Sequence, residues 1–131
     1  MPPPSPAPGT PQDWLARARG KLIMARGPLP PGTFLEDACF FCQQAAELAI
    51  KAVYQQRGWL FPFVHDLEQL LSGLQSQGLT VPADVLEAEK LTDFAVEARY
   101  PGLAPPVSDS EYEDAVQIAE AVVVWAQSLI P

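Results

Sequence analysis

The fold is indicated first by one stretch, residues 33–57, which reads TFLEDACFFCQQAAELAIKAVYQQR. If it is helical throughout, it is about 36 Å long at 1.5 Å per residue. Its apolar residues recur every three or four positions, the spacing of one face of an α-helix. They are Phe34, Leu35, Ala38, Phe41, Cys42, Ala45, Leu48, Ala49, Ala52 and Val53. The stretch therefore predicts a long amphipathic helix that packs against other helices.

Both ends of this helix carry recognisable signals. Thr33 and Glu36 have the spacing of a capping box, in which each side chain bonds a backbone N–H of the first turn. Arg57 places a cation in the last turn, and Gly58 can adopt the left-handed conformation that ends helices. We therefore expect a helix from Thr33 to Arg57.

Composition limits the class of protein. A chain of 131 residues that is 48% hydrophobic is long enough to form one domain with its own core. Its net charge is -8 and it has eight Lys and Arg residues in all. This balance argues against a surface that binds nucleic acid mainly by neutralising many phosphates, so that any nucleotide site must be local.

The first ten residues, MPPPSPAPGT, are rich in proline and show no apolar periodicity, which predicts a disordered leader over residues 1–10 before a domain at 11–131. They have neither the basic start nor the apolar stretch of a signal peptide. No segment approaches the roughly 20 apolar residues of a membrane helix. We therefore predict a cytoplasmic protein that does not insert in membranes.

Four further helices are expected, over residues 11–26, 65–77, 80–100 and 108–129. Thr10 precedes a proline in the first turn, and Ser108 with Glu111 forms a second capping box. No segment alternates like a strand, and the connections are short. The sequence thus predicts an all-α, up-and-down bundle of four or five helices, with consecutive helices antiparallel.

The last helix carries apolar residues on more than one side, because Val124 and Trp125 lie off its main stripe. A helix of this kind needs two partners. The simplest second partner is another copy of the chain, which predicts a homodimer. The alternative is that the leader or the connection at residues 58–64 covers this surface.

Cys39 and Cys42 form a CxxC motif, which suggests redox or metal chemistry. Redox motifs of this type usually open a helix, where the helix dipole lowers a thiol pKa, whereas these cysteines lie two turns inside one. A zinc site would need two more ligands, and the chain has one histidine. We expect packed, reduced core thiols, no metal and no cofactor.

In an antiparallel bundle, one pole collects the ends of the second and fourth helices and the starts of the third and fifth. Polar residues from distant parts of the chain would meet there, and we take them as the candidate ligand-binding residues. They are Lys51, Arg57, His65, Asp66, Arg99 and Tyr100.

Three short motifs occur in a fixed order: FCQQAAELAIKA at residues 41–52, His65-Asp66-Leu67, and Ala98-Arg99-Tyr100-Pro101. In this order and at these separations they resemble the HEPN family, the higher eukaryotes and prokaryotes nucleotide-binding domains. The resemblance extends from Trp14 to Ile130. It implies a helical bundle, frequent homodimers, and small prokaryotic members that partner minimal nucleotidyltransferases in toxin–antitoxin pairs.

Many relatives are metal-independent ribonucleases in which an Arg is followed after four to six residues by a His. That pattern is absent here: no histidine follows Arg99, and seven residues separate Arg57 from His65. Ribonuclease chemistry would have to combine Arg99, as phosphate ligand, with His65, as acid or base, from separate helices.

Each candidate also has a structural interpretation. His65 can bond backbone at the start of its helix, Asp66 can cap that helix, and Lys51 can pair with Glu47. Arg99 can form an ion pair with Asp66. The aromatic residues of the 58–64 connection can stack on a base, cover the core or fill an interface.

Three hypotheses follow. The first is a dimeric nucleotide-binding module that partners a nucleotidyltransferase, which suits the acidic net charge. The second is a ribonuclease toxin that uses Arg99 and His65. The third is a helical interaction protein without a ligand.

Overall fold

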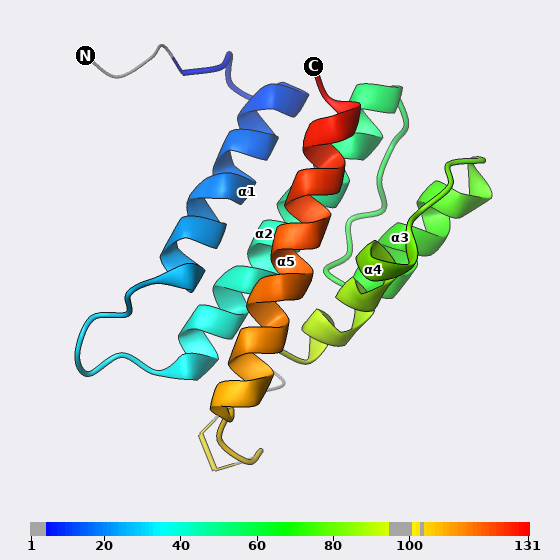
Figure 1. Ribbon diagram of the computed structural model, residues 1–131. Helices are drawn as coiled ribbons and strands as arrows, with labels where there is room; N and C mark the ends of the chain where they lie inside the picture. The colour runs from blue at the N-terminus through cyan, green and yellow to red at the C-terminus, as the bar shows by residue number, and fades with distance from the viewer. Residues whose placement is uncertain (1–4, 95–100, 103) are drawn as a thin grey trace.

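The computed structural model describes residues 5–94, 101, 102 and 104–131. Its elements are α1 (Pro11–Arg26), α2 (Leu35–Arg57), α3 (Leu67–Ser76), α4 (Ala83–Leu86), the 3₁₀-helix η1 (Glu87–Phe94) and α5 (Asp109–Leu129) (Figure 1). No strand occurs in this described part of the chain. The prediction of an all-α bundle is confirmed. None of the described helices is long and apolar enough to cross a membrane.

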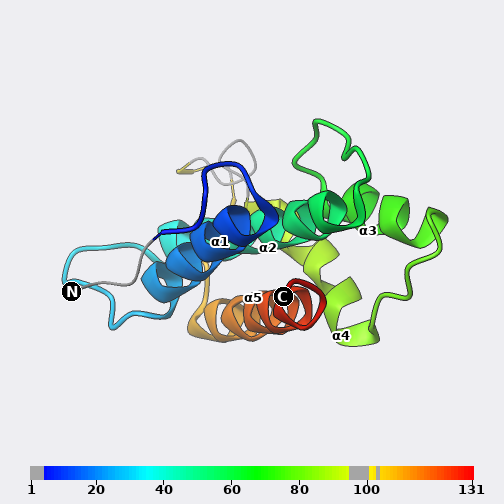
Figure 2. The same ribbon diagram turned by 90° about the horizontal axis from the view of Figure 1, so that it is seen from above.

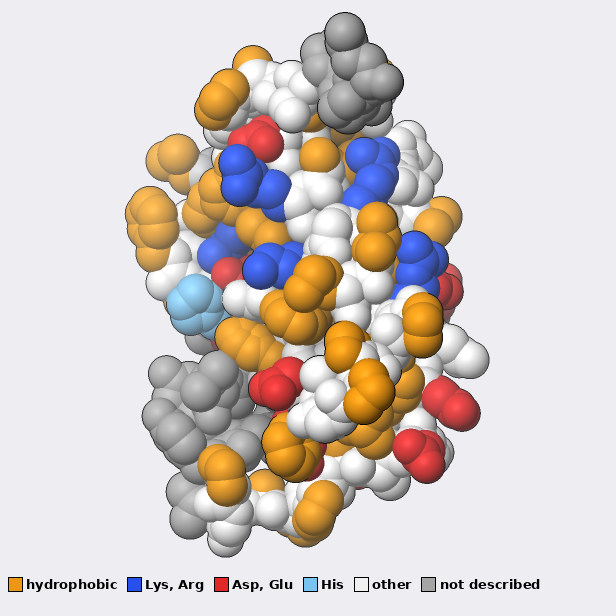
Figure 3. Space-filling model, turned by 90° about the vertical axis from the view of Figure 1, so that its left-hand side faces the viewer, with side chains coloured by type: hydrophobic (Ala, Val, Ile, Leu, Met, Phe, Trp, Pro, Cys, Tyr) orange, Lys and Arg blue, Asp and Glu red, His pale blue; other side chains and the backbone are white. Residues whose placement is uncertain are grey.

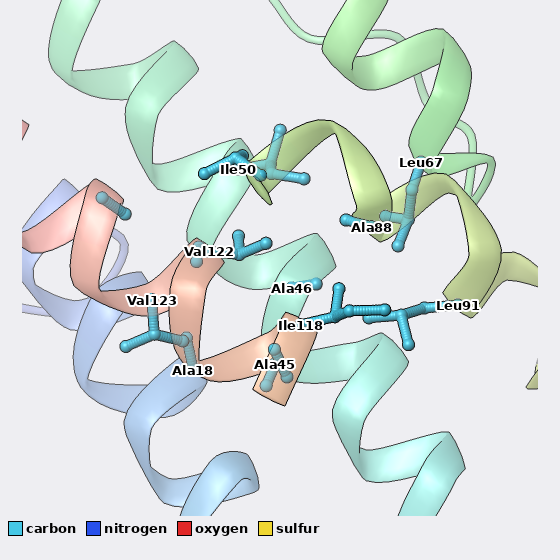
Figure 4. Close-up of a cluster of buried hydrophobic side chains, with 14 of the residues drawn as sticks. Ala18, Ala45, Ala46, Ile50, Leu67, Ala88, Leu91, Ile118, Val122 and Val123 are labelled. Atoms are coloured by element: carbon cyan, nitrogen blue, oxygen red, sulfur yellow. The ribbon is translucent and has the colours of Figure 1, made fainter. Parts of the chain in front are cut away.

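Three long helices, α1, α2 and α5, pack side by side, and the shorter α3, α4 and η1 pack beside α2 and α5 (Figures 1 and 2). α1 runs antiparallel to α2 and α5. The core between them is rich in alanine, and Ala18, Ala45 and Ala46 are fully buried among Ile118, Leu91 and other aliphatic side chains (Figure 4). Small side chains at these positions allow the helix backbones to approach closely.

Most helix ends agree with the sequence signals. The Thr10 hydroxyl accepts a bond from the backbone of Asp13, and Ser108 and Glu111 form the predicted capping box. Gly58 adopts the left-handed conformation at the end of α2. Asp66 caps α3, accepting from the backbone N–H of the two residues that follow Leu67.

The capping box predicted at Thr33 is wrong. α2 begins at Leu35, and its N-cap, Phe34, makes no side-chain cap bond. The Thr33 hydroxyl donates instead to the Pro30 carbonyl at 2.7 Å. The Glu36 carboxylate accepts a hydrogen bond from the backbone N–H of Val107 at 3.1 Å. This long-range contact occupies the carboxylate that the capping box with Thr33 would need.

The fourth helix also differs from its prediction over residues 80–100. A single α-helical turn, α4, passes into η1, in which Ala88, Leu91 and Phe94 are all buried. Because a 3₁₀-helix has three residues per turn, this spacing places the three side chains on one face. The end predicted at Arg99 and Tyr100 lies outside the described residues.

The direction of α3 is the main correction to the topology. Residues 58–66 run back along α2, so that the His65 carbonyl lies 3.4 Å from the side chain of Gln43. α3 then rises beside α2 again, and the Leu70 carbonyl accepts a bond from the Tyr54 hydroxyl at 2.6 Å. The expected antiparallel packing of α2 and α3 is wrong. The connection of residues 58–66 runs antiparallel to α2, so that α3 then runs in the same direction as α2.

Candidate functional site

A groove of about 770 Å³ lies between α1 and α2. On the α1 side it is lined by Arg17, Gly20, Lys21 and Met24. On the other side it is lined by α2 residues that include Phe41, Gln44, Glu47 and Leu48, and by His65 from the returning connection. We call this the α1–α2 groove. It combines apolar side chains with cations on one rim.

The groove lies in the more basic half of a very unevenly charged chain. Residues 1–65 contain six Lys and Arg against four Asp and Glu, whereas residues 66–131 contain two against twelve. The first half therefore carries a formal charge of +2 and the second half -10, giving the total of -8. Figure 3 shows the result on the α1 side of the molecule, where Lys and Arg side chains gather in the upper half among apolar ones, and the His side chain lies near mid-height at the left edge.

The Glu47 carboxylate is in contact with three polar side chains at the groove. Its carboxylate accepts bonds from Lys51 Nζ and Gln43 Nε2, both at 2.9 Å, and lies 2.9 Å from His65 Nδ1. Burial alone would raise the pKa of Glu47, but these three hydrogen bonds together lower it below its usual 4.5. The carboxylate is thus ionised near neutral pH, and its charge is offset by its neighbours.

Lys51 is the most buried cation of this cluster, with its side chain 9% exposed. Besides Glu47 it contacts the Phe61 ring, whose centroid lies 5.1 Å from Nζ. Phe61 in turn packs against Trp14 and Tyr54, at centroid distances of 5.4 and 6.3 Å. The expected pairing of Lys51 with Glu47 is confirmed. Through its contact with Phe61, Lys51 also holds the 58–66 connection against α2.

His65 is anchored on one side only. Nδ1 faces Glu47, which fits the tautomer that carries its proton there, and the side chain is 82% exposed. Nε2 is therefore accessible from the groove. With Nδ1–H held by the carboxylate, Nε2 accepts a hydrogen bond or a proton in the neutral ring, and it donates to an anionic ligand only when the ring is protonated.

The two cations on α1 are one helical turn apart. Arg17 pairs with Asp13 at 3.2 Å and keeps 66% of its side chain exposed. Lys21 Nζ lies 5.3 Å from the centroid of the Phe41 ring. Arg17 is exposed and Lys21 is partly buried, and both side chains are long enough to reach a ligand in the groove.

A family model for the HEPN domain matches residues 11–129. The chain belongs to the HEPN family. Two solved structures are similar to it. The protein TT1696 from Thermus thermophilus is 32% identical with a TM-score of 0.78, over 92% of this chain and 98% of that one. An archaeal HEPN homologue, ST0689, is 27% identical with a TM-score of 0.74, over 93% and 98%. No curated protein matches the sequence.

The fold brings together only part of the pole expected for this HEPN domain. Lys51 and His65 meet at Glu47. Arg57 lies ten residues after Glu47 on α2, which is about 15 Å along the helix at 1.5 Å per residue. Its guanidinium carbon lies 5.9 Å from the centroid of the Trp59 ring. Asp66 caps α3. The remaining two candidates, Arg99 and Tyr100, lie outside the described residues, as does any ion pair between Arg99 and Asp66.

Sequence reasoning missed the α1 side of the site. Arg17, Gly20 and Lys21 are not among the candidate residues that the sequence indicates. Two signals were available: the i, i+4 spacing of the two cations on a predicted helix, and the charge asymmetry between the halves of the chain. Neither depends on knowledge of the fold.

Two other features of the HEPN domain suit an anionic ligand less well. A cavity of about 630 Å³ is lined by Phe34, Phe40, Phe94 and several prolines, with the carboxylates of Glu36 and Asp37. The CxxC thiols are buried and reduced, as expected, and burial raises the pKa of Cys42 to about 12. Within the described residues, no group of three or more His, Cys, Asp or Glu could hold a metal ion.

Proposed function

We propose that this HEPN domain binds a phosphate-bearing nucleotide in the α1–α2 groove. One observation carries the proposal: Arg17, Lys21 and His65 line one groove of an otherwise acidic chain, while Lys51 offsets the carboxylate of Glu47 in the same groove. Guanidinium, ammonium and imidazolium groups form charge-assisted hydrogen bonds with phosphate oxygens, and these are stronger than neutral ones.

The number of cations favours a mononucleotide over a nucleic-acid strand. Proteins that bind long nucleic acids through their backbone make about six to ten phosphate contacts. The groove offers two cations, Arg17 and Lys21, together with the ring of His65. Residues 66–131, with twelve Asp and Glu against two Lys and Arg, would repel an extended polyanion that left the groove.

Titration calorimetry with ATP, ADP, AMP, GTP and inorganic phosphate tests this function. The wild-type protein should bind nucleotides, and the double variant Arg17→Ala/Lys21→Ala should bind them at least about tenfold more weakly, because two charge-assisted contacts are lost. Arg26→Ala is the matched control, since Arg26 lies on α1 but pairs with Glu120 outside the groove. Absence of heat at millimolar nucleotide, or equal weakening in the control, would refute the proposal.

We further propose that this HEPN domain binds a minimal nucleotidyltransferase that is encoded by a separate gene. The acidic composition of residues 66–131 supports a basic partner rather than free RNA. A nucleotidyltransferase gene beside this one, and copurification of the two products, are the observations that support the pairing. We place the pair in the cytoplasm.

A second copy of the chain is proposed to cover α5. Val124 is 63% exposed, and Trp125 packs against the core. The 58–64 connection does not cover this helix, because Phe61 packs against α1 and α2 and the connection projects away from α5 (Figure 2). Ile23 on α1 is also exposed. Arg26 lies one helical turn from Ile23 on α1, and Glu120 lies one turn from Val124 on α5, and these two charged residues form an ion pair with each other.

The homodimer predicts a concentration-dependent mass in sedimentation equilibrium. Val124→Glu should shift the protein to monomer, because a two-fold interface would bury two new carboxylates near each other. Met24→Glu is the control, since Met24 is similarly exposed but lines the α1–α2 groove. A wild-type monomer at high concentration, or a Val124→Glu dimer as tight as wild type, would contradict this interface.

A further inference from the structure

We propose that the α1–α2 groove selects phosphate groups that carry two negative charges, as terminal phosphates do, and that His65 takes up a proton when such a group binds. This inference rests on the proposed nucleotide binding, which names no class of phosphate. It comes from the charge balance of the groove and from the way in which Glu47 holds the His65 ring.

The permanently charged side chains of the groove leave a small positive excess. In the part of the chain that the structure describes, the groove lining and its ion-pair partners contain the cations Arg17, Lys21 and Lys51 and the carboxylates Asp13 and Glu47. Three cations against two carboxylates leave one positive charge. A phosphate dianion would therefore keep one negative charge uncompensated as long as the His65 ring is neutral.

His65 can supply the missing positive charge. Its Nδ1 lies 2.9 and 3.1 Å from the two carboxylate oxygens of Glu47, and this contact leaves Nε2 free for a ligand. A protonated ring carries a hydrogen on both nitrogens. It can then donate to Glu47 from Nδ1 and to a phosphate oxygen from Nε2, and both are charge-assisted hydrogen bonds.

The other groups next to His65 leave it as the proton acceptor. Asp66, the following residue, caps α3. From η1, the uncharged Thr92 hydroxyl accepts a bond from the backbone N–H of Leu67. His65 is the one histidine of the chain, and histidine is the side chain that ordinarily titrates near neutral pH, at about 6.5.

Binding of the phosphate and binding of the proton are therefore linked. Phosphate monoesters carry two negative charges above their second pKa of about 6, whereas a phosphodiester carries only one. A dianion favours the proton on His65, and by reciprocity the proton raises the affinity for the dianion. A diester is already balanced by the single excess charge of the groove, so it gains less from the proton. The groove should thus prefer a terminal phosphate to a diester.

Titration calorimetry with AMP and cyclic AMP tests this preference, because the two ligands share a base and a sugar and differ by one negative charge on the phosphate. At about pH 7.5 the wild-type protein should bind AMP at least about tenfold more tightly, the effect of one additional charge-assisted contact.

Proton uptake is measured by repeating the AMP titrations in buffers that differ in ionisation enthalpy, such as Tris and HEPES. AMP should bind with a net uptake of about half a proton or more at about pH 7.5, and its affinity should fall as the pH rises from about 7 to about 9. The affinity falls in this direction because only the protonated ring donates from Nε2.

His65→Gln should abolish the proton uptake and reduce the preference for AMP, because glutamine keeps a polar side chain but cannot gain a charge. Its fold is expected to persist, since the His65 side chain is 82% exposed. Glu68→Gln is the matched control. Glu68 is exposed on α3 and absent from the groove lining, so this variant should retain both the uptake and the preference.

The outcomes separate this inference from the function on which it rests. Equal wild-type affinities for AMP and cyclic AMP would overturn the selection of dianions and leave nucleotide binding intact. Binding of AMP without proton uptake, or unchanged uptake by His65→Gln, would overturn the role of His65. Failure of every nucleotide to bind the wild type would remove the proposed function and this inference together.

Discussion

Glu47→Gln is expected to lower the free energy of unfolding by about 3 kcal/mol, the typical cost of removing one partner from a buried ion pair. The side chains of Glu47 and Lys51 are only 14% and 9% exposed, so the substitution leaves the Lys51 ammonium without its counterion in a largely dry environment. The loss would be read from urea denaturation at pH 7. Glu113→Gln, at an exposed position on α5, is the control and should change little.

A second variant distinguishes the cost of an unpaired charge from a general disruption of packing around Glu47 and Lys51. In Glu47→Leu/Lys51→Met both charges are replaced by apolar groups of similar length, which should recover much of the lost stability. His65 loses its anchor in both variants, but it is largely exposed and its loss should cost little. If the double variant is less stable than Glu47→Gln, the cost does not come from an unpaired charge.

The same carboxylate gives the protein a pH dependence of known sign. Because the pKa of Glu47 is lower in the folded chain than its usual 4.5, its contribution is complete above that value. The contribution is lost as the pH falls through the lower, folded pKa. Glu47→Gln should therefore lose less stability than the wild type when urea titrations are repeated below pH 4.5. Parallel acid profiles for the two proteins would contradict the assignment.

Gly73→Ala is expected to destabilise the protein by about 2 kcal/mol, although the same change in most helix interiors is stabilising. A Cβ at this position in α3 would lie 2.1 Å from the Tyr54 hydroxyl oxygen. Tyr54 is almost fully buried, and its hydroxyl donates to the Leu70 carbonyl at 2.6 Å, so the ring has little freedom to move. Thermal or urea unfolding would measure the effect.

Two companion variants make the Gly73 result specific. Tyr54→Phe removes the clashing oxygen, so it should cost less in the Gly73→Ala background than in the wild type, giving a measurable coupling energy. Gly20→Ala is the matched control, because its Cβ would meet no atom within 4 Å and should stabilise α1. A Gly73→Ala protein as stable as Gly20→Ala would show that α3 does not pack against Tyr54 as described.

Local signals predicted the parts of the fold whose energetics are local. The Thr10 and Ser108 caps each satisfy N–H groups within one turn, and both form as the sequence indicates. The Thr33 box has the same pattern and fails, because Glu36 bonds Val107 instead. A motif of two residues cannot show that a third, 71 positions away, competes for the same carboxylate.

The candidate site was predictable only in part for a similar reason. Lys51 and Glu47 are four residues apart on one helix, and their pairing follows from the helical repeat. His65 joins them because the connection after Arg57 runs back along α2, and Phe61 fixes that path by packing against Trp14. The sequence placed Arg57 beside His65, since a short connection between antiparallel helices was assumed.

The sequence alone thus determined that the chain is a bundle of amphipathic helices, where most of them end, and which family it resembles. Those properties follow from apolar periodicity and from hydrogen bonds within one helical turn. The tertiary structure decided the direction of α3 and the joining of α1 with α2 around a cationic groove. These depend on packing between side chains far apart in the chain, such as Phe61 on Trp14, whose partners no local pattern specifies.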